Sequence, residues 1–339
     1  MKYLFITVLH NLELGRTYNK GIKLGNNIRI SNGKDPLADI IYTNPLMETM
    51  GEHSLLEFSD NSTYLYIKGT FEEINEAREF ININKNGIIV FKMLREIQAF
   101  THKLWFVKDN SIYIRDGFLL IYDKKINSEY INAHSFKGSL SEVITNRNGK
   151  IEPVVFSDYE IKKAYNDYSA ELDFSDNYWM SIDKKDEDTI GGKLPIPDIF
   201  IKEKDSNRVD RAKYFTVAAR ASSIIPTKLL NYISALECLF TTSTNELAHQ
   251  ISERVAILLG GNLDERLQYY AAIKTAYNYR SKIVHGDSIK KYYEKLESIE
   301  AVCQKVDFVL RTIFSHHTGI FSKTDEEIDN CFKYMIFRD

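Results

Sequence analysis

The residues best suited to chemistry lie together in one short stretch, Arg280-Ser281-Lys282-Ile283-Val284-His285. A histidine side chain has an ordinary pKa close to neutrality, so it can accept or donate a proton at physiological pH. An arginine side chain is permanently charged, and its planar fork matches the oxygens of a phosphate. The pair therefore fits metal-free RNA cleavage, in which His285 handles the ribose 2′-hydroxyl proton and Arg280 stabilises charge on the phosphate.

The spacing of these two residues constrains how they can act. Five residues along an ideal α-helix turn through about 500°, so the two side chains point roughly 140° apart. They reach one phosphate only if the helix ends near His285, where Gly286 would suit such an end, or if a second subunit supplies one of them. A purely structural alternative is open: His285 offsets the helix dipole and Gly286 forms a left-handed cap.

Four further side chains flank the pair. We expect Tyr279 to contact the substrate, because an aromatic ring can stack on an RNA base. Ser281 and Lys282 are candidates for contacts with the substrate phosphate, although a lysine at a helix end is more often a solvated charge. Tyr277 follows the apolar helical period and is expected to pack in the core near the site.

A carboxylate in an apolar segment is a further candidate. Glu237 lies in the middle of an apolar helical face, where its charge needs a partner. Arg254 lies on the next predicted helix. We expect the two to form a buried ion pair, and we prefer that role for Glu237 over a catalytic one.

Three blocks of the C-terminal part share an order and spacing that are more specific than the Arg280/His285 pair. They are Leu229–Phe240, Ile251–Ala256 and Tyr277–Gly286. Together they resemble the HEPN superfamily, in particular the ApeA-like HEPN domains of bacterial defence proteins. The resemblance covers roughly residues 205–315. Many HEPN relatives have Asn, Asp or His after the arginine, whereas this chain has Ser281, which looks like the ApeA-like branch.

The resemblance implies a helical domain that forms a homodimer and cuts RNA without a metal, with Arg280 and His285 as catalytic residues of a shared cleft. It also implies that Glu237 and Arg254 are fixed elements of the domain. The setting that it suggests is bacterial defence against phage, or a toxin-like growth arrest. Many HEPN members lack nuclease activity, so the alternative is a non-catalytic HEPN module for dimerisation or partner binding.

The apolar period after residue 205 is helical and predicts a bundle. The predicted helices cover about residues 210–225, 229–240, 244–260, 264–277 and 292–314. Pro226 is expected to interrupt the first of them, Thr244 to cap the third and Gly260-Gly261 to end it. Short connections predict antiparallel neighbours.

Residues 1 to about 125 show a mixed pattern of strands and helices. Strand-like runs cover residues 4–9, 63–68, 104–107, 112–115 and 118–122, and the last three are separated by turn residues as in a meander. Helical patterns cover residues 71–83 and 88–102, and a further helix is expected over residues 158–172.

A polar stretch from Asp183 to Gly192, closely followed by two prolines, is the clearest linker, because charge, paired glycines and prolines disfavour packed structure. We therefore predict an α+β fold: a mixed α/β domain over residues 1–182, a linker over 183–204 and an all-α domain over 205–339. The first domain is expected to bind a phage-derived or stress ligand and to restrain the second.

The composition is that of a globular protein. With 339 residues, 44% hydrophobic and 27% charged, the chain is long enough for two domains. Its net charge of −3 gives no overall basic footprint for nucleic acid, although a short single-stranded loop needs few phosphate contacts.

Several function classes are disfavoured by what the sequence lacks. No run approaches the ~18 apolar residues of a membrane span, so we expect no membrane partner. Phosphate-binding glycine loops and metal-ligand spacings are absent, so we expect no cofactor and no metal. Three distant cysteines without a C-x-x-C motif fit a cytoplasmic protein.

Overall fold

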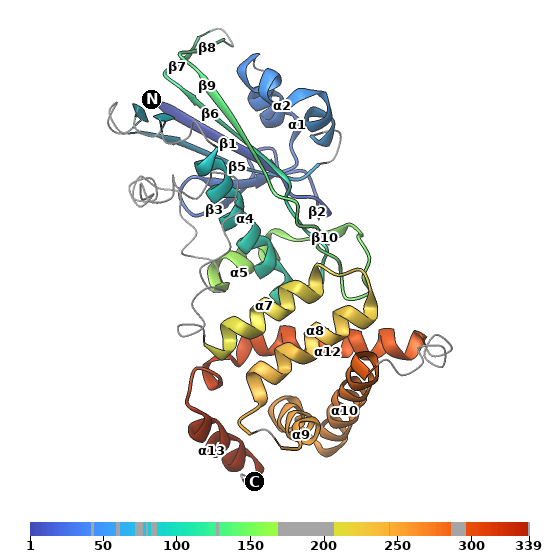
Figure 1. Ribbon diagram of the computed structural model, residues 1–339. Coiled ribbons are helices and arrows are strands. Elements are labelled where there is room, and N and C mark those ends of the chain that lie inside the picture. The colour runs from blue at the N-terminus through green and yellow to red at the C-terminus, as the bar shows by residue number, and fades with distance from the viewer. Residues whose placement is uncertain are drawn as a thin grey trace. The chain divides into compact units, whose positions relative to one another are not determined.

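The computed structural model describes residues 1–337 except 42–43, 59–61, 72–76, 79–80, 83–86, 127–128, 169–206, 244 and 286–295. The described residues divide into two compact units, and each is treated by itself (Figure 1). The first holds residues 1–143 and those described from 152 to 168. The second holds residues 144–151 and those described from 207 onward. The predicted linker and most of the predicted helix over residues 71–83 lie outside the described residues.

The first unit is built on a six-stranded antiparallel sheet with the order β3-β4-β5-β1-β6-β9. The strands are β1 (Lys2–Val8), β3 (Ile22–Leu24), β4 (Ile28–Ser31), β5 (Tyr64–Thr70), β6 (Asp116–Tyr122) and β9 (His134–Ser139). Central β1 pairs with β5 on one side and with β6 on the other. The strand predictions at residues 4–9, 63–68 and 118–122 are therefore confirmed.

Short strands complete the unit. A parallel pair joins β2 (Leu12–Leu14) to β10 (Val154–Phe156), and a hairpin joins β7 (Lys124–Ile126) to β8 (Glu129–Ile131).

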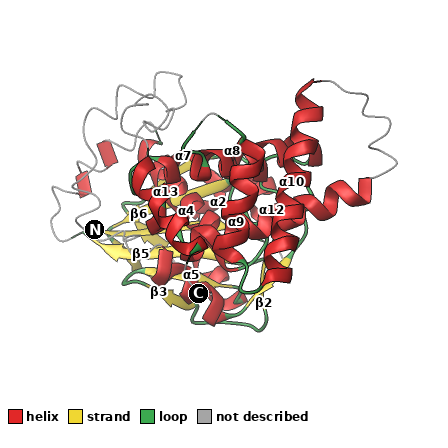
Figure 2. Cartoon of the chain, turned by 90° about the horizontal axis from the view of Figure 1, so that it is seen from below, coloured by secondary structure: helices red, strands yellow, loops and turns green. Residues whose placement is uncertain are grey.

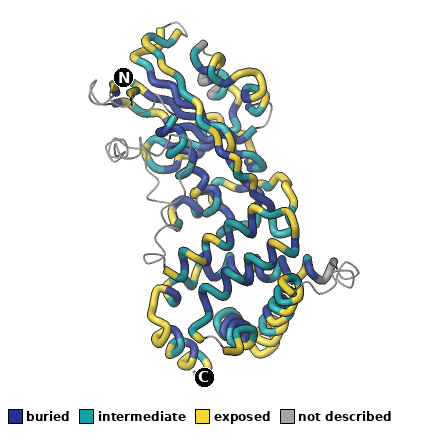
Figure 3. The backbone as a smooth tube through the Cα atoms, viewed as in Figure 1, coloured by how far each residue is buried: buried dark blue, intermediate teal, exposed yellow. Residues whose placement is uncertain are grey.

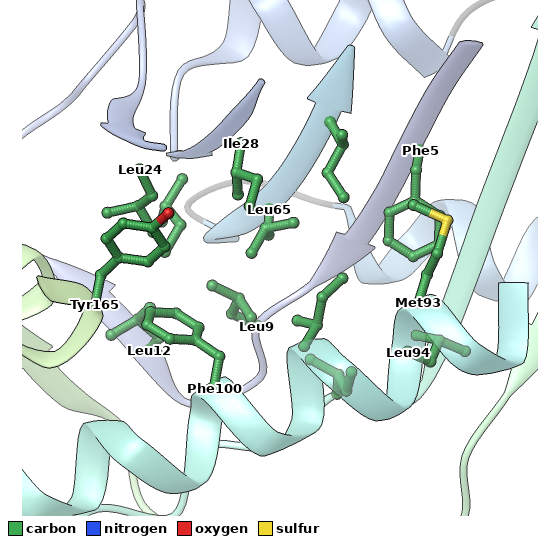
Figure 4. Packing of buried hydrophobic residues seen from close by; sticks show 14 of the residues in the cluster. Phe5, Leu9, Leu12, Leu24, Ile28, Leu65, Met93, Leu94, Phe100 and Tyr165 are labelled. Carbon is green, nitrogen blue, oxygen red and sulfur yellow. The ribbon is translucent and has the colours of Figure 1, made fainter. Parts of the chain in front are cut away.

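Helices cover both faces of the six-stranded sheet. On one face lies α4 (Ile88–Val107), with α5 (Asp158–Tyr168) beside it, and their apolar side chains share a core with Phe5, Leu65 and Ile67. Figure 4 shows α4 presenting Met93, Leu94 and Phe100 to this core. The other face carries α1 (Lys34–Ile41) and α2 (Asn44–Glu57), and a smaller core that includes Leu4, Ile6 and Phe118.

Two strand predictions are wrong. The run at residues 104–107 belongs to α4, because Phe100, Leu104 and the preceding buried residues continue one helical period. The run at residues 112–115 forms only an isolated bridge between His10 and Tyr113. A short apolar run fits a strand and a buried helix turn equally well, so periodicity alone does not separate them.

All described strands belong to the first unit, and the second unit is helical, so the predicted α+β fold class is confirmed. Figure 2 shows the helices and strands of the chain in different colours. Its elements are α7 (Arg208–Arg220), α8 (Ile225–Phe240), α9 (Leu247–Leu259), α10 (Leu263–His285), α12 (Leu296–His316), the 3-10 turn η5 (Thr318–Ile320) and α13 (Asp325–Ile336). Pro226 does not lie at the end of a long first helix. It lies in the first turn of α8, where its missing N–H costs nothing.

The last helix, α13, was not predicted. Its sequence signal is a capping box in which the Thr324 hydroxyl accepts from the Glu327 N–H and the Glu327 carboxylate accepts from the Thr324 N–H. Within the second unit, α8 has a continuous line of buried residues from Ile225 to Phe240 (Figure 3). Among the described residues, no helix combines the length and the apolar character needed to cross a membrane.

Residues 144–151 pack with the helices of the second unit, although the sequence prediction groups them with the first. The Thr145 hydroxyl donates to the carbonyl oxygens of Arg220 (2.7 Å) and Ser222 (2.8 Å). Gly149 has a φ of 72°, and a Cβ there would lie 2.3 Å from the Ser223 oxygen, so only glycine fits. The segment is therefore a built part of the helical unit.

The half-buried His10 of the first unit predicts an acid-sensitive fold. The His10 ring stacks on Tyr113 at 4.7 Å between centroids, and burial followed by the Arg115 charge lowers the pKa of His10 to about 4. The ordinary value is ~6.5, so the unfolded chain binds more protons as the pH falls from 6.5 to 4, and stability is lost across that window.

We expect His10→Phe, which keeps a ring against Tyr113, to lose less stability than the wild type between pH 7 and pH 4.5. The difference should be about 2–3 kcal/mol, measured by urea unfolding at the two pH values. Parallel pH profiles for the two proteins would contradict the assignment.

Candidate functional site

The candidate arginine is held at the junction of two helices. Arg280, on α10, places its Nη2 atom 3.5 Å from Oε2 of Glu237, on α8, and the two side chains are 30% and 20% exposed. Its guanidinium also lies over the Tyr277 ring, one turn earlier on α10, at 5.7 Å from the centroid. The Nε atom of Arg280 is buried and makes no hydrogen bond with the described residues. The charge is thus oriented by a carboxylate and a ring, but its hydrogen-bonding capacity is not filled.

The candidate histidine points elsewhere. Helix α10 continues without a break through His285, so the five-residue offset separates the two side chains by roughly 140°. Arg280 turns toward α8, whereas His285 is exposed. One chain therefore does not bring the two groups to a common point. The predicted helix end at Gly286 lies outside the described residues.

The other predicted site residues are distributed around Arg280. Tyr277 is half-buried, and its pKa is raised first by burial and then by the charge of Glu237. The Tyr277 hydroxyl also donates a hydrogen bond to the Glu237 carboxylate. Tyr277 thus lies beside Arg280 and Glu237, while Ile273 and Ala276 are the buried core residues of α10. Tyr279 and Ser281 are partly exposed, and Lys282 is exposed.

The predicted ion pair between Glu237 and Arg254 is wrong. Arg254 donates from Nη1 to the Phe240 carbonyl oxygen at 2.7 Å, and its Nη2 bonds to the Asp329 carboxylate. The carbonyl groups at the end of a helix lack partners within it, so a nearby arginine can satisfy them. Glu237 lies one turn before that end and faces α10.

The apolar pattern did not predict two acidic residues of this region, Asp325 and Asp329, which both lie on α13. Asp329 pairs with Arg254, and Asp325, one turn earlier, pairs with Arg208. Arg208 in turn donates to the Thr241 carbonyl oxygen at 2.6 Å. The sequence signal for these two pairs was the four-residue spacing of Asp325 and Asp329, which follow the N-cap residue Thr324.

A second buried polar contact lies deeper in the unit. The Tyr232 hydroxyl donates to Oδ1 of Asp307 at 2.7 Å, and both residues are buried. Burial, and then the Asp307 charge, raise the pKa of Tyr232 well above its ordinary value. An aspartate within the apolar run of α12 is the sequence signal for such a contact.

Comparison with known proteins identifies no relative. No family model, no curated protein and no solved structure matches this chain. Among the described residues, no group of three or more His, Cys, Asp or Glu side chains is arranged to hold a metal ion. The candidate site therefore consists of Glu237, Tyr277 and Arg280, with His285 on the same helix as Arg280.

The corrected pairing can be measured by double-mutant cycles. We expect a coupling energy of about 1–2 kcal/mol between Arg254 and Asp329, because Arg254 is 9% exposed and its partner 37%. The more exposed Arg208–Asp325 pair should couple by under about 1 kcal/mol. Glu237 and Arg254 should show none. Urea unfolding of the single and double variants gives these coupling energies. A large coupling between Glu237 and Arg254 would instead support the ion pair predicted from the sequence.

Proposed function

We propose that the second unit is a metal-independent endoribonuclease of the HEPN type, with Arg280 and His285 as its catalytic residues. One observation carries the proposal. The helix that presents an exposed His285 also presents Arg280 as a half-buried guanidinium, positioned by Glu237 and Tyr277. Such positioning reduces the rotamer freedom that an arginine loses when it binds a phosphate.

The chemistry follows from the two side chains. The His285 imidazole removes the proton of the ribose 2′-hydroxyl, and the 2′-oxygen attacks the adjacent phosphorus. Arg280 stabilises the added negative charge on the phosphoryl oxygens. The bond from phosphorus to the 5′-oxygen then breaks, and that oxygen takes up a proton. The products are a 2′,3′-cyclic phosphate and a 5′-hydroxyl.

The divergence of the two side chains supports a composite site. Because Arg280 and His285 point apart on a continuous helix, the proposed reaction needs a second copy of the chain to complete each site. Helix α10 is suited to meet a copy of itself, since its exposed surface includes the apolar residues Leu263, Leu267 and Val284. We propose RNA as the substrate and bacterial defence, or a toxin-like growth arrest, as the setting.

A second candidate function is favoured by the Glu237 contact. The carboxylate neutralises Arg280 within its own chain, as expected of a structural ion pair in a non-catalytic module. In that case α10 would serve dimerisation or partner binding alone. The two functions differ in what happens to RNA.

The first test is cleavage of single-stranded RNA by the purified full chain in the presence of EDTA. We expect 2′,3′-cyclic phosphate ends, and a loss of rate of ~10²-fold or more in His285→Ala and in Arg280→Ala. Arg280→Lys should recover only part of the rate, because it keeps the charge without the fork.

The matched control is His316→Ala, which removes an exposed histidine at the end of a different helix, α12, and should leave the rate unchanged. Full activity in both site variants would refute the catalytic assignment. Folded protein without cleavage of any RNA tested would favour the non-catalytic module.

A mixing experiment tests the composite site. An excess of Arg280→Ala/His285→Ala chains, added to wild type and allowed to exchange subunits, should depress the activity per wild-type chain. The reason is that mixed dimers contain only incomplete sites. Activity that scales with the wild-type chains alone, or full activity of a monomer at micromolar concentration, rules the shared site out.

A further inference from the structure

One face of the sheet in the first unit carries basic residues at neighbouring positions on successive strands. Lys23 of β3 lies directly opposite Arg29 of β4, and Arg29 lies directly opposite Tyr66 of β5. Lys68 follows two residues after Tyr66 on β5 and lies directly opposite Leu4 of β1, and Lys2 lies two residues before Leu4. These cations thus occupy four adjacent strands.

Strand alternation places all four cations on the same face. Side chains two residues apart on a strand share a face, and directly paired residues do so as well. The residues between them, such as Ile22, Ile28 and Ile67, point to the opposite face and enter the core under α4. With strands about 4.8 Å apart, the row spans roughly 15 Å.

The cations of the row are exposed at Lys2, Lys23 and Lys68. Tyr66 and Leu4, which lie between them on this face, are buried in the core shared with α1 and α2, and α2 packs over β6 and β9. Strands β3, β4 and β5 contain no aspartate or glutamate. Like charges directly opposite one another destabilise a sheet, so the Lys23–Arg29 pairing is costly unless an anion lies near it.

Two features of the row favour a ligand that has both aromatic bases and phosphates. Arg29 is fixed by a hydrogen bond from Nη1 to the Lys20 carbonyl oxygen at 3.0 Å, at the turn before β3. Tyr122 lies directly opposite Lys2, half-buried, and its ring meets that of Tyr130 edge-on at 4.6 Å. Aromatic rings beside a basic row are the combination that binds single-stranded nucleic acid.

We propose that this face, formed by Lys2, Lys23, Arg29 and Lys68, binds the phosphate backbone of single-stranded RNA. The inference deepens the proposed function, on which it rests for the choice of RNA: the first unit would hold the polymer that the second unit cuts. An acidic protein is the competing occupant, but it offers no bases to stack beside the lysines.

The test measures binding without cleavage. Fluorescence anisotropy of a labelled oligouridylate is followed with the full chain carrying His285→Ala, over a series of salt concentrations. Adding Lys2→Gln, Lys23→Gln and Lys68→Gln should lower the slope of log affinity against log salt by about 2, because each single-strand phosphate contact contributes about 0.7.

The matched control removes three lysines from α4 and α5, which cover the opposite face: Lys92→Gln, Lys162→Gln and Lys163→Gln. The net charge changes equally, so its slope should stay at the parent value. Equal slopes for the two triple variants would overturn the proposal, as would competition by polyglutamate equal to that by oligouridylate of the same charge. Because the assay needs no cleavage, loss of nuclease function and loss of RNA binding are separate outcomes.

Discussion

The C-terminal end of α8 sets the arrangement of the helical unit. A helix that ends inside a protein leaves carbonyl groups that water does not reach, and each unsatisfied group costs about 1–3 kcal/mol. Here, arginines from α7 and α9 donate to these carbonyls, and two aspartates of α13 bind the arginines in turn. One turn earlier, Glu237 holds Arg280 of α10. The requirement to satisfy one helix end thus fixes three other helices, α7, α9 and α13, around it, and the Glu237 side chain adds α10.

The ion pair between Glu237 and Arg280 has opposite effects on stability and on the proposed chemistry. Glu237 stabilises Arg280 in one orientation, which favours the folded state and lowers the entropy lost when a phosphate binds. It also offsets the positive charge that the phosphate would need. In the proposed reaction, a phosphate would compete with a carboxylate 3.5 Å from the Arg280 guanidinium, and the balance would depend on how much water a second copy of the chain excludes. Because the pair is half-buried, Arg280 can either stay paired with Glu237 or turn to a phosphate.

The sequence predicted the elements better than their contacts. The apolar period located α4 and α8 to within a few residues, because one face of each is buried along its whole length. It failed for residues 104–107, where four apolar residues fit either period. The partner of Arg254 was missed for a different reason. A charged residue specifies that it needs a counter-charge but not from which helix, and Asp329 lies 75 positions away in the sequence. The divergence of Arg280 and His285 followed from helix geometry alone.

The segment around Thr145 has a consequence for the order of synthesis. It leaves the ribosome before any helix of the second unit. Its partners come much later in the chain: Arg220 lies 75 residues after Thr145, and Gln304 lies 156 residues after Asn148. During translation the segment must wait, tethered to a nascent first unit, until the helices that enclose it emerge. Contacts of such long sequence separation form late and slow folding. A chain that begins after this segment would never acquire it, so the helical unit is not a simple C-terminal fragment of the protein.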